Sequence, residues 1–261
     1  SAGGVAVGRA GGLYVAVHVG LLSPSSPQAH FHNDLLSFEL QWQGVDIVVD
    51  PGCFVYTPLP EVRNAYRATA AHNTVEVEGR EQRLWPRSPA ALFAIDQDAD
   101  LVSIKDLRPN GLRALCAYGP VRHERAWSWT PNRLEVRDTV LAAHPATATL
   151  NLAPGVQPEA EAKPQEGVWL LKLRSDAGTI GLRWEGVARP AVQPGLFSVG
   201  YGREMECSRI RAVMTGTDAR FALELEPSNE TAVRFLMSYH WQNRAATRGI
   251  EVYNTLYRYL D

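Results

Sequence analysis

The chain has 261 residues, of which 45% are hydrophobic and 21% are charged, and its formal net charge at pH 7 is −2. This composition is ordinary for a globular protein with a buried core, and it argues against a basic, nucleic-acid-binding surface. No apolar run approaches the roughly 18 residues that a membrane span needs. The three cysteines, Cys53, Cys116 and Cys207, are odd in number and widely spaced, which argues against a disulfide framework or a cysteine-based zinc site.

Residues 1–12 are rich in glycine and alanine and are typical of a linker or of the remnant of a junction with something upstream. From residue 13 onward, apolar and polar residues alternate with a period of two, as they do in half-buried strands. The first strand is predicted over residues 13–19. Residues 35–50 predict two strands joined by a turn at Gly44, and the second contains a fully apolar run, Ile47 to Val49.

After residue 90 the strands follow one another at fairly regular spacing, with turn signals such as Pro109-Asn110-Gly111 between them. Ten or more short strands without a long helical segment predict an all-β fold, a large antiparallel β-sandwich. Residues 13–240 are predicted to form one domain. In the remaining tail, 241–261, apolar residues recur at helical spacing, which predicts a short C-terminal helix or an appended segment.

Histidines and aspartates flank the hairpin predicted between residues 29 and 52: His30, His32, Asp34 and Asp50. If the chain turns near Gly44, His32 and Asp50 come close together at the open end of that hairpin. Imidazole and carboxylate groups are ligands that zinc accepts. The pattern alone leaves a second interpretation open, in which a histidine near a strand end is a hydrogen-bonded structural residue and Asp50 merely forms a turn.

The third metal donor would be His72, at the entry to the next predicted strand. Asp50 is followed by Pro51-Gly52, a turn sequence that would hold its carboxylate still. Spacing therefore predicts a His-Asp-His metal site formed by His32, Asp50 and His72.

Two blocks in this region, HFHNDLLSFELQWQGVDIVVDPG and RNAYRATAAHNTVEVEGREQ, resemble the C-terminal β-sheet domain of heparinase II/III-like polysaccharide lyases. Both lie within residues 30–82; NLAPGV and FSVGYG match as a looser β pattern. The resemblance implies a supersandwich-like fold and β-elimination of uronic-acid polysaccharides in a cleft. In the family that cleft lies between this domain and an N-terminal α/α-toroid, which is not part of this chain.

The resemblance also implies roles for individual residues. His32, Asp50 and His72 would bind zinc in a structural role. His30 would face the substrate cleft, and His30 and Tyr66 are the candidate catalytic residues. The candidate substrate-binding residues lie on or near the segment RNAYRAT, which resembles a cleft-lining loop: Arg63, Arg67 and Asn73.

Three of the proposed cleft residues, Arg63, Arg67 and Tyr66, have a plainer interpretation. The arginines could belong to a solvated strand-and-loop surface, and Tyr66 could be an ordinary half-buried tyrosine at a strand end. β-Elimination needs a base, an acid and a group that stabilises negative charge, and these side chains could supply all three.

The leading hypothesis is therefore the zinc-bearing β domain of a lyase acting on glycosaminoglycan-like or alginate-like polysaccharide, located in the periplasm or secreted. The alternative is a non-catalytic module that binds acidic glycans, and a purely structural sandwich is a third hypothesis.

Overall fold

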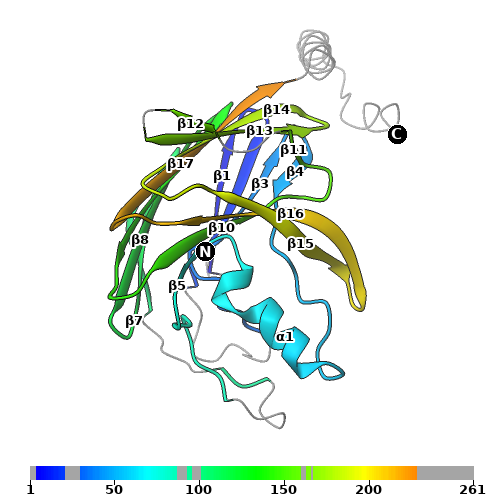
Figure 1. The fold of residues 1–261 in the computed structure, drawn as a ribbon, viewed down its shortest axis with the longest axis vertical. Helices are drawn as coiled ribbons and strands as arrows, with labels where there is room; N and C mark the ends of the chain where they lie inside the picture. The colour runs from blue at the N-terminus through cyan, green and yellow to red at the C-terminus, as the bar shows by residue number, and fades with distance from the viewer. Residues whose placement is uncertain are drawn as a thin grey trace, which may run out of the picture. The chain divides into compact units, whose positions relative to one another are not determined.

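The computed structural model describes residues 4–20, 30–86, 93–95, 101–159, 163–165 and 167–227. The described chain up to Glu226 forms one compact unit. The predicted C-terminal helix in residues 241–261 lies outside the described residues. The prediction of an all-β antiparallel sandwich is confirmed: three sheets carry most of the described residues, and they enclose one continuous core (Figure 1).

The first sheet has four antiparallel strands in chain order, β1 to β4. Their bounds are β1 Val5–Ala10, β2 Leu13–His18, β3 Phe38–Trp42 and β4 Val45–Val48. Strand β1 is a difference from the sequence prediction, because residues 1–12 were expected to be a linker. Buried and exposed residues do not alternate in β1, and only Gly8 of the strand is buried. The sequence of β1 therefore lacks the period-two pattern by which the other strands were predicted.

The second sheet also has four antiparallel strands, in the order β15-β16-β10-β5. Their bounds are β15 Ala191–Gly200, β16 Arg203–Val213, β10 Ala146–Asn151 and β5 Val75–Val77. The strands therefore come from distant parts of the sequence. Strands β15 and β16 form a long hairpin, which lies near the helix α1 (Pro60–Arg67) in Figure 1.

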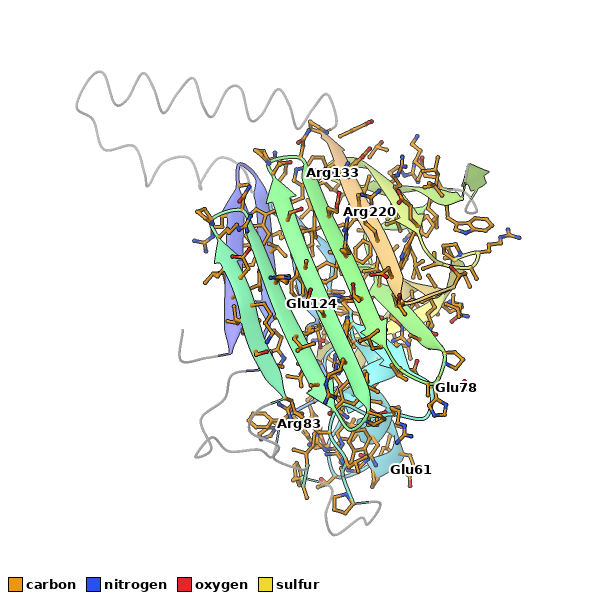
Figure 2. All side chains as sticks on the ribbon, turned by 90° about the vertical axis from the view of Figure 1, so that its left-hand side faces the viewer. Glu61, Glu78, Arg83, Glu124, Arg133 and Arg220 are labelled. Carbon is orange, nitrogen blue, oxygen red and sulfur yellow. The ribbon has the colours of Figure 1, made fainter. Side chains whose placement is uncertain are left out.

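The third sheet has nine strands, and eight of them follow the order β11-β13-β14-β17-β9-β8-β7-β6, while β12 pairs only with β13. Their bounds are β6 Val102–Arg108, β7 Gly111–Tyr118, β8 Val121–Thr130, β9 Arg133–Leu141, β11 Gln157–Pro158, β12 Lys163–Gln165, β13 Val168–Ser175, β14 Gly178–Glu185 and β17 Asp218–Pro227. Its outward face carries charged side chains, including Glu124, Arg133 and Arg220 (Figure 2). Arg133 pairs with Glu224, and Arg220 pairs with Glu185. Such exposed ion pairs add little stability but keep this face polar.

Aromatic side chains join the sheets in the core. The ring of Phe221 on β17 lies 5.1 Å from that of Trp184 on β14 and 6.0 Å from that of Phe38 on β3, measured between centroids. All three side chains are buried. Phe221 therefore links the nine-stranded sheet to the first four-stranded sheet. Such contacts are expected where the inward-facing side chains of two packed sheets interdigitate.

The predicted hairpin at Gly44 is present and joins β3 to β4. Its two turn residues, Gln43 and Gly44, have φ angles of +52° and +80°. Two consecutive positive φ angles match the twist of the flanking strands, which explains why a glycine stands here. The hairpin brings the start of β3 beside the end of β4, and that juxtaposition builds the site described next.

Candidate metal centre

The three predicted metal donors converge. One ligand atom from each of His32, Asp50 and His72 lies within 4.8 Å of the other two. His72 Nδ1 lies 2.6 Å from Asp50 Oδ2, and the rings of His32 and His72 are 5.3 Å apart between centroids. The spacing argument is therefore confirmed at the level of geometry: these side chains form a group that could hold a metal ion.

Each donor sits just outside a regular element. His32 lies in the loop before β3, Asp50 follows β4, and His72 caps the short 3₁₀ helix η1 (Thr69–Ala71) before β5. The backbone N–H of Gly52 donates to Asp50 Oδ1 at 2.9 Å, so the predicted turn does orient the carboxylate. Asp50 is consequently both a turn former and a member of the donor group.

Asn73 ties the two ends of the hairpin together. Its amide nitrogen donates to the carbonyl oxygens of Phe38 and Val49, at 2.9 and 2.8 Å. Its amide oxygen accepts hydrogen bonds from Asn151, from the backbone nitrogen at 2.7 Å and from the side chain at 3.0 Å. Asn73 has no exposed surface, and its amide is used within the protein. This arrangement is structural and does not fit the expected substrate contact.

A buried ion network supports the same region from the nine-stranded sheet. Arg125 on β8 pairs with Asp138 on β9 through two contacts, Nε to Oδ1 at 2.6 Å and Nη2 to Oδ2 at 3.0 Å. His123 Nε2 also lies 2.7 Å from Asp138 Oδ1. Arg125 Nη1 then donates to the carbonyl oxygens of Leu36 and Asn73, at 3.0 and 2.7 Å. Arg125 thus connects the large sheet to two of the three segments that carry the candidate metal donors, those of His32 and His72.

The protonation states suit a ligand role for His32. Burial, and then repulsion from His72, lowers the pKa of His32 to about 4, so its imidazole is neutral at neutral pH. Burial also lowers the pKa of His72, but the nearby carboxylates, Asp50 first and then Asp34 and Glu81, together outweigh burial and raise it above the ordinary value. The Nε2 atom of His72 is buried and has no hydrogen-bond partner among the described residues. An unsatisfied buried imidazole nitrogen calls for a ligand.

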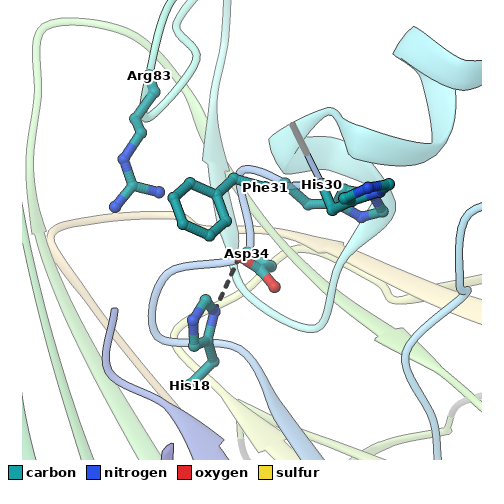
Figure 3. Close-up of a pocket in the computed structure, with 6 residues that line it drawn as sticks. His18, His30, Phe31, Asp34 and Arg83 are labelled. Atoms are coloured by element: carbon teal, nitrogen blue, oxygen red, sulfur yellow. Dashed lines mark ion pairs between the residues drawn. The ribbon is translucent and has the colours of Figure 1, made fainter. Parts of the chain in front are cut away.

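His30 lies beside this group but points elsewhere. Its side chain is exposed, and its ring meets the edge of Tyr56 with the centroids 5.2 Å apart. An open cavity of about 250 Å³ is lined by six residues: His18, His30, Phe31, His32, Asp34 and Arg83 (Figure 3). His30 and His32 thus differ in their surroundings, with the first exposed and the second in the group that could hold a metal ion.

Four members of this cavity wall were not predicted as site residues: His18, Phe31, Asp34 and Arg83. His18 Nδ1 lies 2.8 Å from Asp34 (Figure 3). Although burial alone would raise it, the pKa of Asp34 lies below its ordinary value because His18 and the other nearby histidines favour the carboxylate. The alternation of residues in β2 placed His18 on the more exposed face of the strand. Periodicity cannot show that this face borders the loop that contains Asp34. Arg83 lines the same cavity from the segment that follows β5.

The segment RNAYRAT was expected to be a cleft-lining loop, and most of it belongs to the helix α1. A proline at the helix start and an acidic residue, Glu61, in the first turn favour a helix here. Arg63 and Arg67 are each 1% exposed, so neither a solvated surface nor direct substrate contact describes them in this chain. Arg63 lies over the rings of Tyr56 and Phe93 at 5.1 and 4.7 Å.

Arg67 is packed in a similar way. Its guanidinium lies 4.4 Å from the centre of the Trp85 ring, and it donates to Asn64 Oδ1 at 2.9 Å and to the Ala94 carbonyl at 3.2 Å. Cation–π contacts of this kind are strongest where water is excluded. The two arginines therefore fix the surroundings of α1.

Tyr66 is buried on α1, and its hydroxyl donates to Glu204 on β16. Burial, and then the hydrogen bond to Glu204, raises the pKa of Tyr66 above its ordinary value. Catalysis by a tyrosinate base would need a lowered pKa, so the described surroundings do not prepare Tyr66 for that role. The bond instead joins α1 to the β15–β16 hairpin.

Comparison with known proteins identifies the family. A family model described as "Heparinase II/III-like, C-terminal" matches residues 1–242, so the chain belongs to this family. No curated protein sequence matches the chain. In the part of the chain that the structure describes, no helix is long and apolar enough to cross a membrane.

The fold resembles solved polysaccharide-lyase structures. A heparan sulfate lyase HepC mutant from Pedobacter heparinus has a TM-score of 0.65 at 16% identity, over 87% of this chain and 36% of that chain. A heparinase III with methylated lysines has a TM-score of 0.62 at 17% identity, over 88% of this chain and 35% of that one. This chain therefore spans about a third of those proteins, and at such low identity the likeness concerns the fold alone.

Proposed function

We propose that this chain is the β-sandwich domain of a polysaccharide lyase that cleaves uronic-acid-containing polysaccharide by β-elimination. The observation that carries the proposal is the arrangement of two histidines, His30 and His32, that are separated by a single residue. His32 turns inward to Asp50 and His72, while His30 stays exposed on the wall of an open polar cavity. Membership of the heparinase II/III-like family supports the reaction class.

A zinc ion fits the inner group. Two imidazoles and a carboxylate are ligands that zinc accepts, His32 is neutral at neutral pH, and the buried Nε2 of His72 lacks another partner among the described residues. His32, Asp50 and His72 would hold the ion. When bound, it would cross-link the loop before β3, the end of β4 and the entry to β5, and so fix the segment that carries His30.

β-Elimination of a uronate transfers the C5 proton to a base, forms a C4–C5 double bond and breaks the bond between C4 and the glycosidic oxygen, which takes up a proton. An imidazole suits the proton transfers, and His30 is the exposed imidazole beside the cavity. Negative charge grows on the substrate carboxylate as the C5 proton leaves. Arg83, on the cavity wall, offers a positive charge to stabilise it.

The proposed lyase needs a second domain to complete its substrate cleft. This chain spans only about a third of the solved relatives, and we infer an N-terminal α/α-toroid that completes the cleft in the full-length protein. The substrate would be glycosaminoglycan-like or alginate-like. Large acidic glycans are degraded outside the cytoplasm, so we infer a periplasmic or secreted location.

One observation favours a second function. Tyr66, the other candidate acid–base group, is tied to Glu204 and has a raised pKa, which leaves His30 as the exposed candidate among the residues predicted to be catalytic. The alternative is that the sandwich binds an acidic glycan without cleaving it.

An ultraviolet assay for unsaturated uronates separates the two functions. It is run on this chain and on the protein with its native upstream region, with heparan sulfate and alginate as substrates. Product from the longer form supports the lyase, and loss of that product in His30→Ala assigns the imidazole. Glycan retention without product in both forms supports the binding module.

Elemental analysis of protein purified without chelator tests the metal. We expect about one zinc per chain, and we expect its loss in His32→Ala and in Asp50→Ala. His30→Ala and the exposed His144→Ala serve as matched controls that keep the ion. A metal-free wild type, or zinc loss in His30→Ala, would contradict these assignments.

A further inference from the structure

An aromatic cluster extends outward from His30. It consists of three rings, Tyr56, Phe93 and Tyr201, and we call it the aromatic shelf. Tyr56 and Tyr201 lie nearly parallel, with an interplanar angle of 22° and centroids 5.9 Å apart, and Tyr56 and Phe93 are 6.2 Å apart. His30 contacts both Tyr56 and Phe93, at 5.2 and 6.3 Å. The candidate catalytic imidazole is therefore the end of a continuous row of rings.

The shelf is open to solvent. Tyr201 is 60% exposed and Phe93 is 37% exposed, although a protein normally buries such rings. Polar and charged residues lie next to Tyr201 in the sequence, including Arg203 and Glu204. A few exposed rings with polar surroundings suit a ligand that has both an apolar face and polar edges.

The shelf is also held rigidly. Tyr201 lies in the turn between β15 and β16, and the backbone N–H of the next residue, Gly202, donates to the Phe54 carbonyl at 2.8 Å. Phe54 N–H donates in turn to Ser198 Oγ at 3.0 Å. These bonds fasten the hairpin tip to the segment between Asp50 and Tyr56. The stacking surface is thus prepared before a ligand arrives.

A buried positive charge lies under two of the rings. The Arg63 guanidinium, 1% exposed, is within 5.1 Å of the Tyr56 ring centre and 4.7 Å of the Phe93 ring centre. It holds the rings in place, and in a low-dielectric setting its charge reaches further than it would in water. This positive charge is compatible with an acidic ligand on the shelf.

We propose that Tyr56 and Tyr201 form a stacking subsite for a pyranose ring of an acidic polysaccharide, next to the sugar that faces His30. A pyranose has an apolar face of C–H groups, which packs on an aromatic ring, and polar hydroxyls around its edge, which stay in water. The row from His30 through Tyr56 to Tyr201 gives the polysaccharide a direction along the domain surface. This inference rests on the proposed function and adds the place where a neighbouring sugar unit binds.

Tyr201 is the residue to change, because its exposure makes a substitution compatible with folding. Binding of end-labelled hexasaccharides of heparan sulfate and of alginate to the full chain is measured by fluorescence polarisation. We expect Tyr201→Ala to bind about five to ten times more weakly than wild type, the loss of roughly one aromatic contact. Tyr201→Phe, which keeps the ring, should bind within about twofold of wild type.

Leu196→Ala is the matched control, since Leu196 is an exposed apolar residue on the same hairpin, 44% exposed, outside the shelf. Its affinity should equal that of wild type. A Tyr201→Trp variant gives a second readout, a change of indole fluorescence on addition of the bound hexasaccharide. Equal affinities of wild type and Tyr201→Ala, or equal loss in Tyr201→Ala and Tyr201→Phe, would overturn the stacking subsite and leave the proposed function standing. A wild type that binds neither hexasaccharide would also overturn the stacking subsite, whereas the proposed function is overturned separately, by absence of unsaturated product from the longer form in the ultraviolet assay.

Discussion

The buried pair of Arg125 and Asp138 offers a sharp test of how this sandwich is stabilised. Arg125 is 0% exposed and Asp138 is 1% exposed, and two short contacts join them. The substitution Asp138→Asn keeps the shape of the side chain but removes its charge. Arg125 is then a buried cation without its counter-ion, and such a change costs about 3–5 kcal/mol of unfolding free energy.

The expected loss is measurable by thermal melting. In a domain of this size, 1 kcal/mol corresponds to a change in Tm of about 2–4 °C. Asp138→Asn should therefore lower Tm by about 6–20 °C. The exposed pair Asp106–Arg108, with side chains 36% and 71% exposed, provides the matched control. Asp106→Asn should cost less than about 1 kcal/mol.

A double substitution completes the experiment. Arg125→Met with Asp138→Leu removes both charges, which should restore part of the stability lost in Asp138→Asn. Recovery stays incomplete because the carbonyls of Leu36 and Asn73 lose their donor, at a cost of about 1–3 kcal/mol each. If Asp138→Asn melts no lower than Asp106→Asn, the reasoning about this buried pair is refuted.

Three further predictions concern other parts of the domain. Burial alone would raise the pKa of Asp138, but Arg125 and His123 lower it from 3.8 to about 2. The ionised carboxylate therefore contributes stability above pH 3.8, and that contribution is lost as the pH falls toward 2. In urea unfolding between about pH 5 and 2, the free energy of unfolding should fall more steeply in wild type than in Asp138→Asn. Gly186→Ala should destabilise the fold more than Gly119→Ala. Both glycines have positive φ angles, but only at Gly186 would the new Cβ meet backbone atoms, 2.2 Å from the Asp218 carbonyl oxygen. Equal urea midpoints of the two variants would contradict this. Burial raises the pKa of Cys116 to about 12, so a thiol reagent should label Cys116 only after unfolding, and mass spectrometry showing label there in the native protein would be the contrary result.

The sandwich could be predicted from the sequence because alternating burial leaves a visible mark in the order of apolar and polar residues. The alternation seen over residues 13–19 is absent from β1, however, where five of six residues are not buried, and this strand could not be recognised. Strand order was also out of reach: β10 pairs with β5 and β16 through contacts between distant segments, which no local pattern encodes.

The convergence of His32 and Asp50 could be predicted because a hairpin register fixes where its two ends meet, and His72 was added as the residue that enters the next strand. The positions of Arg63, Arg67 and Asn73 could not be predicted, since whether a polar side chain faces water depends on what packs over it. Arg63 lies beneath Tyr56 and Phe93, and the amide of Asn73 is bonded within the hairpin and to β10. The helix α1 was missed because a short helix carries little periodicity, although its proline and acidic first turn are start signals.

The two parts of the site differ in how far apart their residues lie along the chain. The contact between Asp50 and His72 spans 22 residues, whereas the bond from Phe54 to Ser198 spans 144 and that from Tyr66 to Glu204 spans 138. Closing a long loop is slower and costs more entropy than closing a short one. During folding we therefore expect the corner formed by His32, Asp50 and His72 to assemble early and the aromatic shelf to be completed late. If the proposed function holds, a partly folded chain would bind its ion before it could bind a glycan.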